Sequence, residues 1–164
     1  NRTNWYYMEL AMDGMKIDGE FVPGVVSKFF FLNADKLNIP MLKLRNKLFK
    51  QFRSGDSGYY QNIQNYLTSH EISSKNIKEK LILLKNSAVE SMNELKQLNH
   101  EALLDDKLND HVKKRTSDAL GLIYNNFKKY IFEVDKLKNG PDSEEEILVK
   151  YIFILMKVFG KVDE

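Results

Sequence analysis

The chain has 164 residues, of which 43% are apolar and 29% are charged, and its formal net charge is +2. It holds 8 glycines, 3 prolines and no cysteine. The apolar fraction is too high and the net charge too small for a disordered chain. The absence of cysteine excludes a disulfide scaffold, a thiolate zinc site, an iron–sulfur cluster and a cysteine nucleophile. We therefore expect a soluble globular protein, and the composition alone assigns no activity to it.

The apolar spacing in the first part of the chain is helical. It predicts a first helix over Thr3–Met12. Two Asp-Gly pairs and one Pro-Gly pair bracket residues 13–24, which indicates a loop or a small hairpin there. The apolar run Val25–Leu37 is compatible with a buried helix or a strand, and we favour a helix because the neighbouring segments are helical.

Two shorter helices are expected next. Pro40 suits the first residue of a helix because its missing N–H would have no partner there. The apolar stripe of this helix consists of Met41, Leu44, Leu48 and Phe52, widened by Leu42 and Phe49. The polar, Gly-containing residues 54–58 predict a loop. A short helix follows over Tyr59–Leu67.

Two long helices are expected in the C-terminal hundred residues. Ser73 or Ser74 is the expected N-cap of the first, and Asp105 or Asp106 that of the second. The 4 and 3 spacing of their apolar residues is typical of helices packed along their length. The apolar positions are Ile77, Leu81, Leu84, Ala88, Leu95, Leu98 and Ala102, then Leu108, Val112, Ala119, Leu122, Ile123, Phe127, Tyr130, Ile131, Val134 and Leu137.

The last helix is apolar on nearly all sides. Ser143 and Glu146 form a capping-box pattern at its start, and Gly160 is expected to end it. Lys150 and Lys157 are seven residues apart and therefore share one narrow polar face. A helix of this kind is usually central in a bundle. The alternative is that part of this face docks a partner or another copy.

These elements predict an all-α fold. We expect a single-domain bundle of about six or seven helices, with a long C-terminal helical hairpin, a central last helix and a possible small hairpin at 13–24. The single domain covers residues 1–164, with N-terminal helices and a loop over 1–58 and a C-terminal helical bundle over 59–164.

The segment 41–53 carries five basic residues and no acid. Its three lysines follow a 4 and 3 spacing and therefore lie on one helical face. A basic helical face can bind phosphates or an acidic partner. It can equally be a solvated face opposite the apolar stripe. The candidate partner-binding residues are Lys43, Arg45, Lys47, Lys50 and Arg53.

No complete set of catalytic or metal-binding residues is visible. The three histidines are His70, His100 and His111, and none has the second histidine four residues away that a helical zinc site requires. His100 and His111 flank an expected helix break and can converge with Asp105 or Asp110. The simpler interpretation is that they are surface residues, so we expect no metal and no cofactor.

We therefore expect a non-enzymatic helical module that binds a protein partner. The first alternative is a carrier of a hydrophobic small molecule or lipid in a cavity between helices, because the chain is rich in Phe, Tyr and Met. The second is binding of nucleic acid or an acidic partner through 41–53, although the near-neutral charge makes nucleic acid the less expected partner. We expect no transmembrane segment, because the longest apolar run, 147–159, is shorter than the ~20 residues that a span needs. The compartment, the partner and the oligomeric state do not follow from the sequence.

Overall fold

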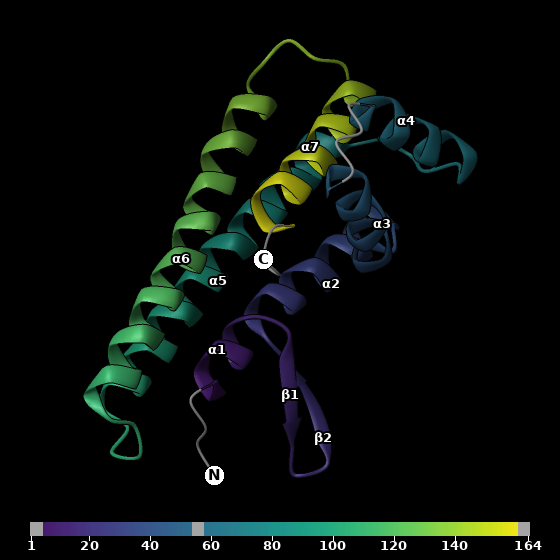
Figure 1. Ribbon diagram of the computed structural model, residues 1–164. Helices are drawn as coiled ribbons and strands as arrows, with labels where there is room; N and C mark the ends of the chain where they lie inside the picture. Colours follow the sequence, from purple (N-terminus) through teal and green to yellow (C-terminus); the bar gives the residue numbers. More distant parts are fainter. Residues whose placement is uncertain (1–4, 54–57, 161–164) are drawn as a thin grey trace. The chain divides into compact units, whose positions relative to one another are not determined.

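The computed structural model describes residues 5–53 and 58–160 (Figure 1). Within these residues the chain forms seven helices and a two-stranded antiparallel sheet, and 76% of the residues are helical. The elements are α1 (Tyr6–Ala11), β1 (Gly14–Ile17), β2 (Glu20–Pro23), α2 (Val25–Leu37), α3 (Met41–Arg53), α4 (Tyr59–Ser69), α5 (Ile77–Leu103), α6 (Asp110–Lys138) and α7 (Glu144–Phe159). The prediction of an all-α fold with about seven helices is confirmed. The predicted loop at 54–58 falls almost entirely outside the described residues.

Contacts between Cα atoms group the chain into two compact units. Unit 1 comprises residues 1–30 and 87–128, and unit 2 comprises residues 31–86 and 129–164. Helices α2, α5 and α6 each contribute residues to both units. Each unit therefore combines residues from both sides of position 58, and the single domain over 1–164 stays a prediction.

The small hairpin of unit 1 follows from its turn residues. Strands β1 and β2 pair in register from Gly14 opposite Pro23 to Ile17 opposite Glu20 (Figure 1). The two residues between them, Asp18 and Gly19, have φ values of 52° and 83°. Positive φ at both central positions is what a two-residue turn needs to match the strand twist, and Asp-Gly is a preferred pair for it. The hairpin expected at 13–24 is thus present.

One cluster of buried residues in unit 1 includes Tyr7 of α1. Its ring packs with Ala102 of α5, and with Leu108 and Val112 near the start of α6. Its hydroxyl donates a hydrogen bond to the Oδ2 atom of Asp105, at 2.7 Å. Asp105 therefore anchors α1 and does not cap α6 as predicted. The N-cap role belongs to Asn109, whose Oδ1 atom accepts the N–H of Val112 at 2.9 Å.

Unit 2 is built around α7, which contacts α3 and α4. Ten of the 16 residues of α7 are buried. Ser143 accepts the N–H of Glu146, and the Glu146 carboxylate accepts the N–H of Ser143, so the predicted capping box is present. Gly160 is the C-cap. The predicted apolar last helix is confirmed.

A chain of hydrogen bonds between polar side chains crosses this core. The Tyr151 hydroxyl on α7 donates to the Oδ1 atom of Asn33 on α2. It lies 2.7 Å from the Tyr130 hydroxyl on α6. All three side chains are fully buried. Burial raises the pKa of both phenols above their ordinary value, although the bond to Tyr151 lowers that of Tyr130 in part.

The apolar stripes of the long helices are largely as predicted. On α5 the expected positions are buried, except that Leu98 is half-buried. On α6 the buried stripe runs through Val112, Thr116, Leu120, Ile123, Phe127, Tyr130, Val134 and Leu137. Leu122, expected in the stripe, is 69% exposed. The stripe keeps to the 3 and 4 spacing. Leu120 is therefore in the core, where Leu122 had been expected.

The start of α5 also differs from the prediction. The helix begins at Ile77, and Ser73 instead accepts the N–H of Lys75 in the preceding turn. The N–H of Ile77 points to the Oε2 atom of Glu144, at 3.4 Å. An acid at the start of α7 therefore also serves the start of α5, which a local capping pattern cannot reveal.

Substitution of three glycines by alanine separates turn geometry from close packing. A Cβ atom at Gly14, where φ is 101°, would lie 2.2 Å from the carbonyl oxygen of Val22. Gly19 and Gly121 have open space around them, but only Gly19 has a positive φ. We expect Gly14→Ala to cost more than about 2 kcal/mol and Gly19→Ala about 1 kcal/mol. Gly121→Ala, inside α6, should add up to about 1 kcal/mol. Urea unfolding measures all three, and equal effects at 14 and 19 would contradict the hairpin geometry.

Removal of the Tyr151 hydroxyl should destabilise the chain. Tyr151→Phe deletes two buried hydrogen bonds, so we expect a loss of about 1–3 kcal/mol in the free energy of unfolding at pH 7. Tyr124→Phe is the matched control, because Tyr124 is half-buried and its ring carries the contact with Lys96. The control should change stability by less than about 0.5 kcal/mol. An equal loss in both variants would show that the buried bonds contribute nothing specific.

The same phenols predict a loss of stability at high pH. Their folded pKa lies above the unfolded value of about 10, so the folded chain holds protons that the unfolded chain has released. Their contribution is fully present below about pH 10 and falls as the pH rises toward the folded pKa. Urea unfolding at pH 9, 10 and 11 should therefore show a smaller decline for Tyr151→Phe than for the unmodified chain. Tyr124→Phe should keep the full decline.

Candidate functional site

The basic segment predicted from the sequence lies on α3. Met41, Leu44 and Leu48 are buried, which turns the opposite side of the helix to solvent. Lys43, Lys47 and Lys50 are exposed on that side, and Arg45 is half-buried. Arg53 lies in α3, but its side chain is outside the described part of the chain.

No ion pair neutralises these three lysines within the described residues. The ion pairs found there use Lys28, Lys85, Lys114 and Lys150. Three positive charges therefore face solvent along one side of α3. This arrangement attracts an anionic partner, with a strength that depends on salt.

A groove adjoins the basic side of α3. It has a volume of about 460 Å³ and lies between α3 and α4, and we call it the α3–α4 groove. The residues that line it are Asn38, Pro40, Lys43, Leu44, Lys47, Tyr66, His70 and Ile72. It thus joins two of the predicted lysines to apolar and aromatic side chains.

The ring of Tyr66 connects the two helices at this groove. The Nζ atom of Lys47 lies 5.9 Å from its centroid, within the range of a cation–π contact. The imidazole of His70 stacks on the same ring, with 4.1 Å between centroids and 22° between planes. One aromatic ring thus holds a lysine from α3 and a histidine from the end of α4 in the lining of a single groove.

The backbone fixes His70 at the end of α4. Its N–H donates to the carbonyl oxygen of Tyr66 at 3.1 Å. The Nδ1 atom of its ring lies 3.0 Å from the same oxygen and 3.1 Å from the hydroxyl of Ser69. A proton on Nδ1 would add a further hydrogen bond to that carbonyl, which already accepts the His70 N–H at the helix end. The ring is therefore held in place by the helix terminus.

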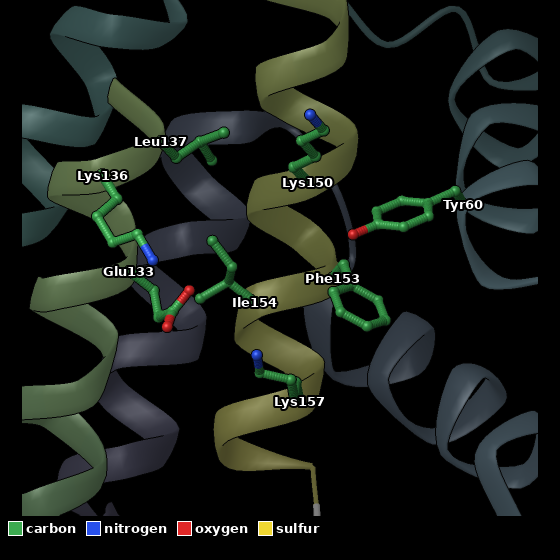
Figure 2. A pocket seen from close by; sticks show the side chains of 8 residues that line it. All are labelled: Tyr60, Glu133, Lys136, Leu137, Lys150, Phe153, Ile154 and Lys157. Atoms are coloured by element: carbon green, nitrogen blue, oxygen red, sulfur yellow. The ribbon is translucent and has the colours of Figure 1, made fainter. Parts of the chain in front are cut away.

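A second, smaller opening lies on α7, at the polar face that the sequence indicated. It has a volume of about 240 Å³ and is formed mainly by α6 and α7, and we call it the α6–α7 hollow (Figure 2). Glu133, Lys136 and Leu137 line it from α6, Lys150, Phe153, Ile154 and Lys157 from α7, and Tyr60 from α4. The spacing of the α7 residues is that of one helical face.

The histidines do not assemble a metal site in the described residues. No group of three or more His, Asp or Glu side chains there is placed to hold a metal ion. His70 lines the α3–α4 groove, whereas His100 and His111 line neither opening. Asp105, a suggested partner of the latter two, accepts hydrogen bonds from Tyr7 and from the N–H of Lys107.

Sequence reasoning identified the lysines of the α3–α4 groove but missed its other wall. Tyr66 lies in the helix predicted over Tyr59–Leu67, and His70 was interpreted either as a metal ligand or as a surface residue. Their place beside Lys47 depends on how α3 and α4 cross, which the spacing within each helix does not specify. An aromatic–histidine pair at i and i+4 is the one local signal that marks this wall.

The comparisons with known proteins give no assignment. No family model matches the chain, and neither a curated protein nor a solved structure is detectably similar to it. None of the helices in the described residues is both long and apolar enough to cross a membrane. Any function must therefore be argued from the surfaces just described.

Proposed function

We propose that this chain is a non-enzymatic interaction module that binds an acidic segment of a partner protein along α3 and in the α3–α4 groove. One observation carries the proposal: three exposed lysines, which pair with no acid among the described residues, adjoin a groove with apolar and aromatic walls. The lysines supply attraction to carboxylates, and the groove supplies area for an apolar side chain. Peptide recognition commonly combines these two elements.

The composition of the groove favours a protein segment over nucleic acid. Leu44, Pro40 and Ile72 line it together with Tyr66. Such a lining suits a leucine-sized side chain flanked by acids. A nucleic-acid site instead follows the phosphate backbone with many cations, and it usually belongs to a markedly basic domain. With a net charge of +2, the chain has no such general attraction.

The hydrogen bonds made by Ser69 and His70 at the groove favour a binding role over catalysis. Ser69 and His70 are adjacent, but the Ser69 hydroxyl donates to the carbonyl oxygen of Tyr66, at 3.1 Å. An activated hydroxyl needs a base that is itself oriented by a third group. The hydrogen bonds of the His70 ring in the described residues lead to a backbone carbonyl and to Ser69, not to a carboxylate.

A carrier role is supported less well by the same openings. A hydrophobic ligand needs a mostly apolar enclosure. The α3–α4 groove and the α6–α7 hollow both carry lysines in their linings. In α7, large side chains such as Tyr151 and Phe159 are fully buried, which is the behaviour of a packed core.

The proposal is tested with a fluorescent Glu- and Leu-containing peptide by anisotropy. We expect binding that weakens between 50 and 300 mM salt. Reversal of two charges, Lys43→Glu with Lys47→Glu, should weaken it at least about tenfold, because each exposed pair contributes up to about 1 kcal/mol. A peptide with Ser in place of Leu should also bind more weakly.

The matched control is Lys128→Glu, which makes the same change of charge on an exposed side of α6. It should stay within about threefold of the unmodified chain, and circular dichroism should show the same helicity for all variants. The absence of peptide binding at 50 mM salt would overturn the proposal. So would tighter binding of a single-stranded oligonucleotide of equal length, or equal losses in the double variant and the control.

A further inference from the structure

The α6–α7 hollow has a chemical character of its own. Its deepest side chains are Leu137 and Ile154, which are 8% and 7% exposed. Tyr60 and Phe153 form an aromatic wall, with 4.9 Å between ring centroids and 36° between planes. Figure 2 shows this wall on one side of α7 and the α6 residues on the other. The hollow thus offers an apolar floor and the face of an aromatic pair.

Three lysines stand at its rim, and they are not equivalent. Lys150 donates to the Oδ2 atom of Asp142 at 2.8 Å, and this bond raises its pKa. Its charge is therefore largely compensated. Lys136 is exposed with its Nζ atom 5.2 Å from the ring centroid of Phe132, and none of the ion pairs in the described residues includes Lys136 or Lys157. Two cations at the rim are available to an anion.

Glu133 is the one acid that the described residues contribute to the lining. It repels an anion and so limits how much negative charge the hollow can accept. Two available lysines against one carboxylate leave a net charge of about +1 when the Lys150–Asp142 pair is counted as neutral. A single carboxylate matches this balance better than a phosphate with a charge near −2.

The size of the hollow sets a second limit. Sites for drug-sized ligands have volumes of roughly 300–1,000 Å³, and this one has about 240 Å³. It therefore suits a smaller molecule, with room for one ring or one branched chain beside the charged group. The aromatic wall favours a flat ring, since aromatic rings gain from offset or tilted contacts with each other.

We propose that the α6–α7 hollow binds a small organic monocarboxylate that carries an aromatic body. The carboxylate lies between Lys136 and Lys157, and the ring lies on Leu137 and Ile154 against the Tyr60–Phe153 wall. The site is separate from the α3–α4 groove, and it does not depend on the function proposed for that groove.

The test uses 3-phenylpropionate as the probe, with calorimetry or chemical-shift titration as the measurement. We expect a Kd below about 1 mM, as a compact ligand of this size can reach. The neutral 3-phenylpropan-1-ol should bind at least about tenfold more weakly because it lacks the charge. Acetate should also bind at least about tenfold more weakly because it lacks the ring. Saturation by acetate or inorganic phosphate with the affinity of 3-phenylpropionate would overturn the proposal.

Variants of the lining residues locate the site, and they should change the affinity for 3-phenylpropionate in opposite directions. Lys136→Gln and Lys157→Gln should each weaken binding about three- to tenfold, whereas Glu133→Gln should strengthen it about threefold by removing a like charge. Lys129→Gln, on an exposed part of α6 outside the hollow, is the matched control and should leave the Kd unchanged.

The paired variant Lys43→Glu and Lys47→Glu should keep the affinity for 3-phenylpropionate, which separates this site from the peptide site. No binding up to about 10 mM in the unmodified chain would overturn the proposal. Weaker binding in Glu133→Gln, or an equal loss in Lys129→Gln, would overturn it as well.

Discussion

The hydrogen bonds of the Tyr151 hydroxyl are the constraint on which the arrangement of unit 2 depends. Helix α7 is apolar on nearly all sides, so burial alone gives many rotations of this helix a similar free energy. A buried hydroxyl has no such freedom, because an unmet polar group in the core costs about 1–3 kcal/mol. Asn33 and Tyr130 satisfy it in one rotation of α7. That rotation turns the face with Lys150, Ile154 and Lys157 toward the α6–α7 hollow.

The acids and the lysines of the chain are used differently. Several acids near the start of α7 act within the fold: Glu146 closes the capping box, Glu144 accepts from the N–H of Ile77, and Asp142 accepts from Lys150. The lysines of α3 have no comparable task in the described residues. The net charge is near zero, but the charges are unevenly distributed. Several acids are engaged within the fold, and the lysines of α3 have no ion-pair partner in the described residues. This imbalance, and not the net charge, makes α3 a candidate for binding.

Much of the fold follows from local patterns. The bounds of α2, the Asp-Gly hairpin and the capping box of α7 were predictable, because each rests on residues close together in the chain. The caps of α5 and α6 were not, because α5 begins after the serines proposed to cap it, and Asp105, proposed for α6, bonds another helix. Asn109 caps α6 and Asp105 bonds Tyr7, from the far end of the chain. A capping residue can be recognised locally, but competition for its side chain cannot.

The sequence also could not predict which residue of an apolar run is exposed. Phe29 and Phe30 are buried, whereas Phe31 is 48% exposed. On a helix with one side toward solvent, the residue of such a run that turns outward depends on the packing partners. The same reasoning applies to the walls of both openings. The sequence predicted that the lysines of α3 and of α7 share a helical face. It could not predict which residues lie opposite them, such as Tyr66 and Leu137, because that depends on how two helices pack.

The two openings differ in a way that their residues explain. In the α3–α4 groove the lysines of one helix face an aromatic–histidine pair, and the described residues contribute no acid to the lining. Such a surface tolerates several negative charges spread along a chain. In the α6–α7 hollow, Glu133 and the Lys150–Asp142 pair already compensate part of the positive charge. The remaining positive charge is enough for one carboxylate, and the small volume has room for one ring or one branched chain beside it. Charge compensation within the lining, more than the number of lysines, therefore separates a surface suited to an acidic segment from one suited to a small anion.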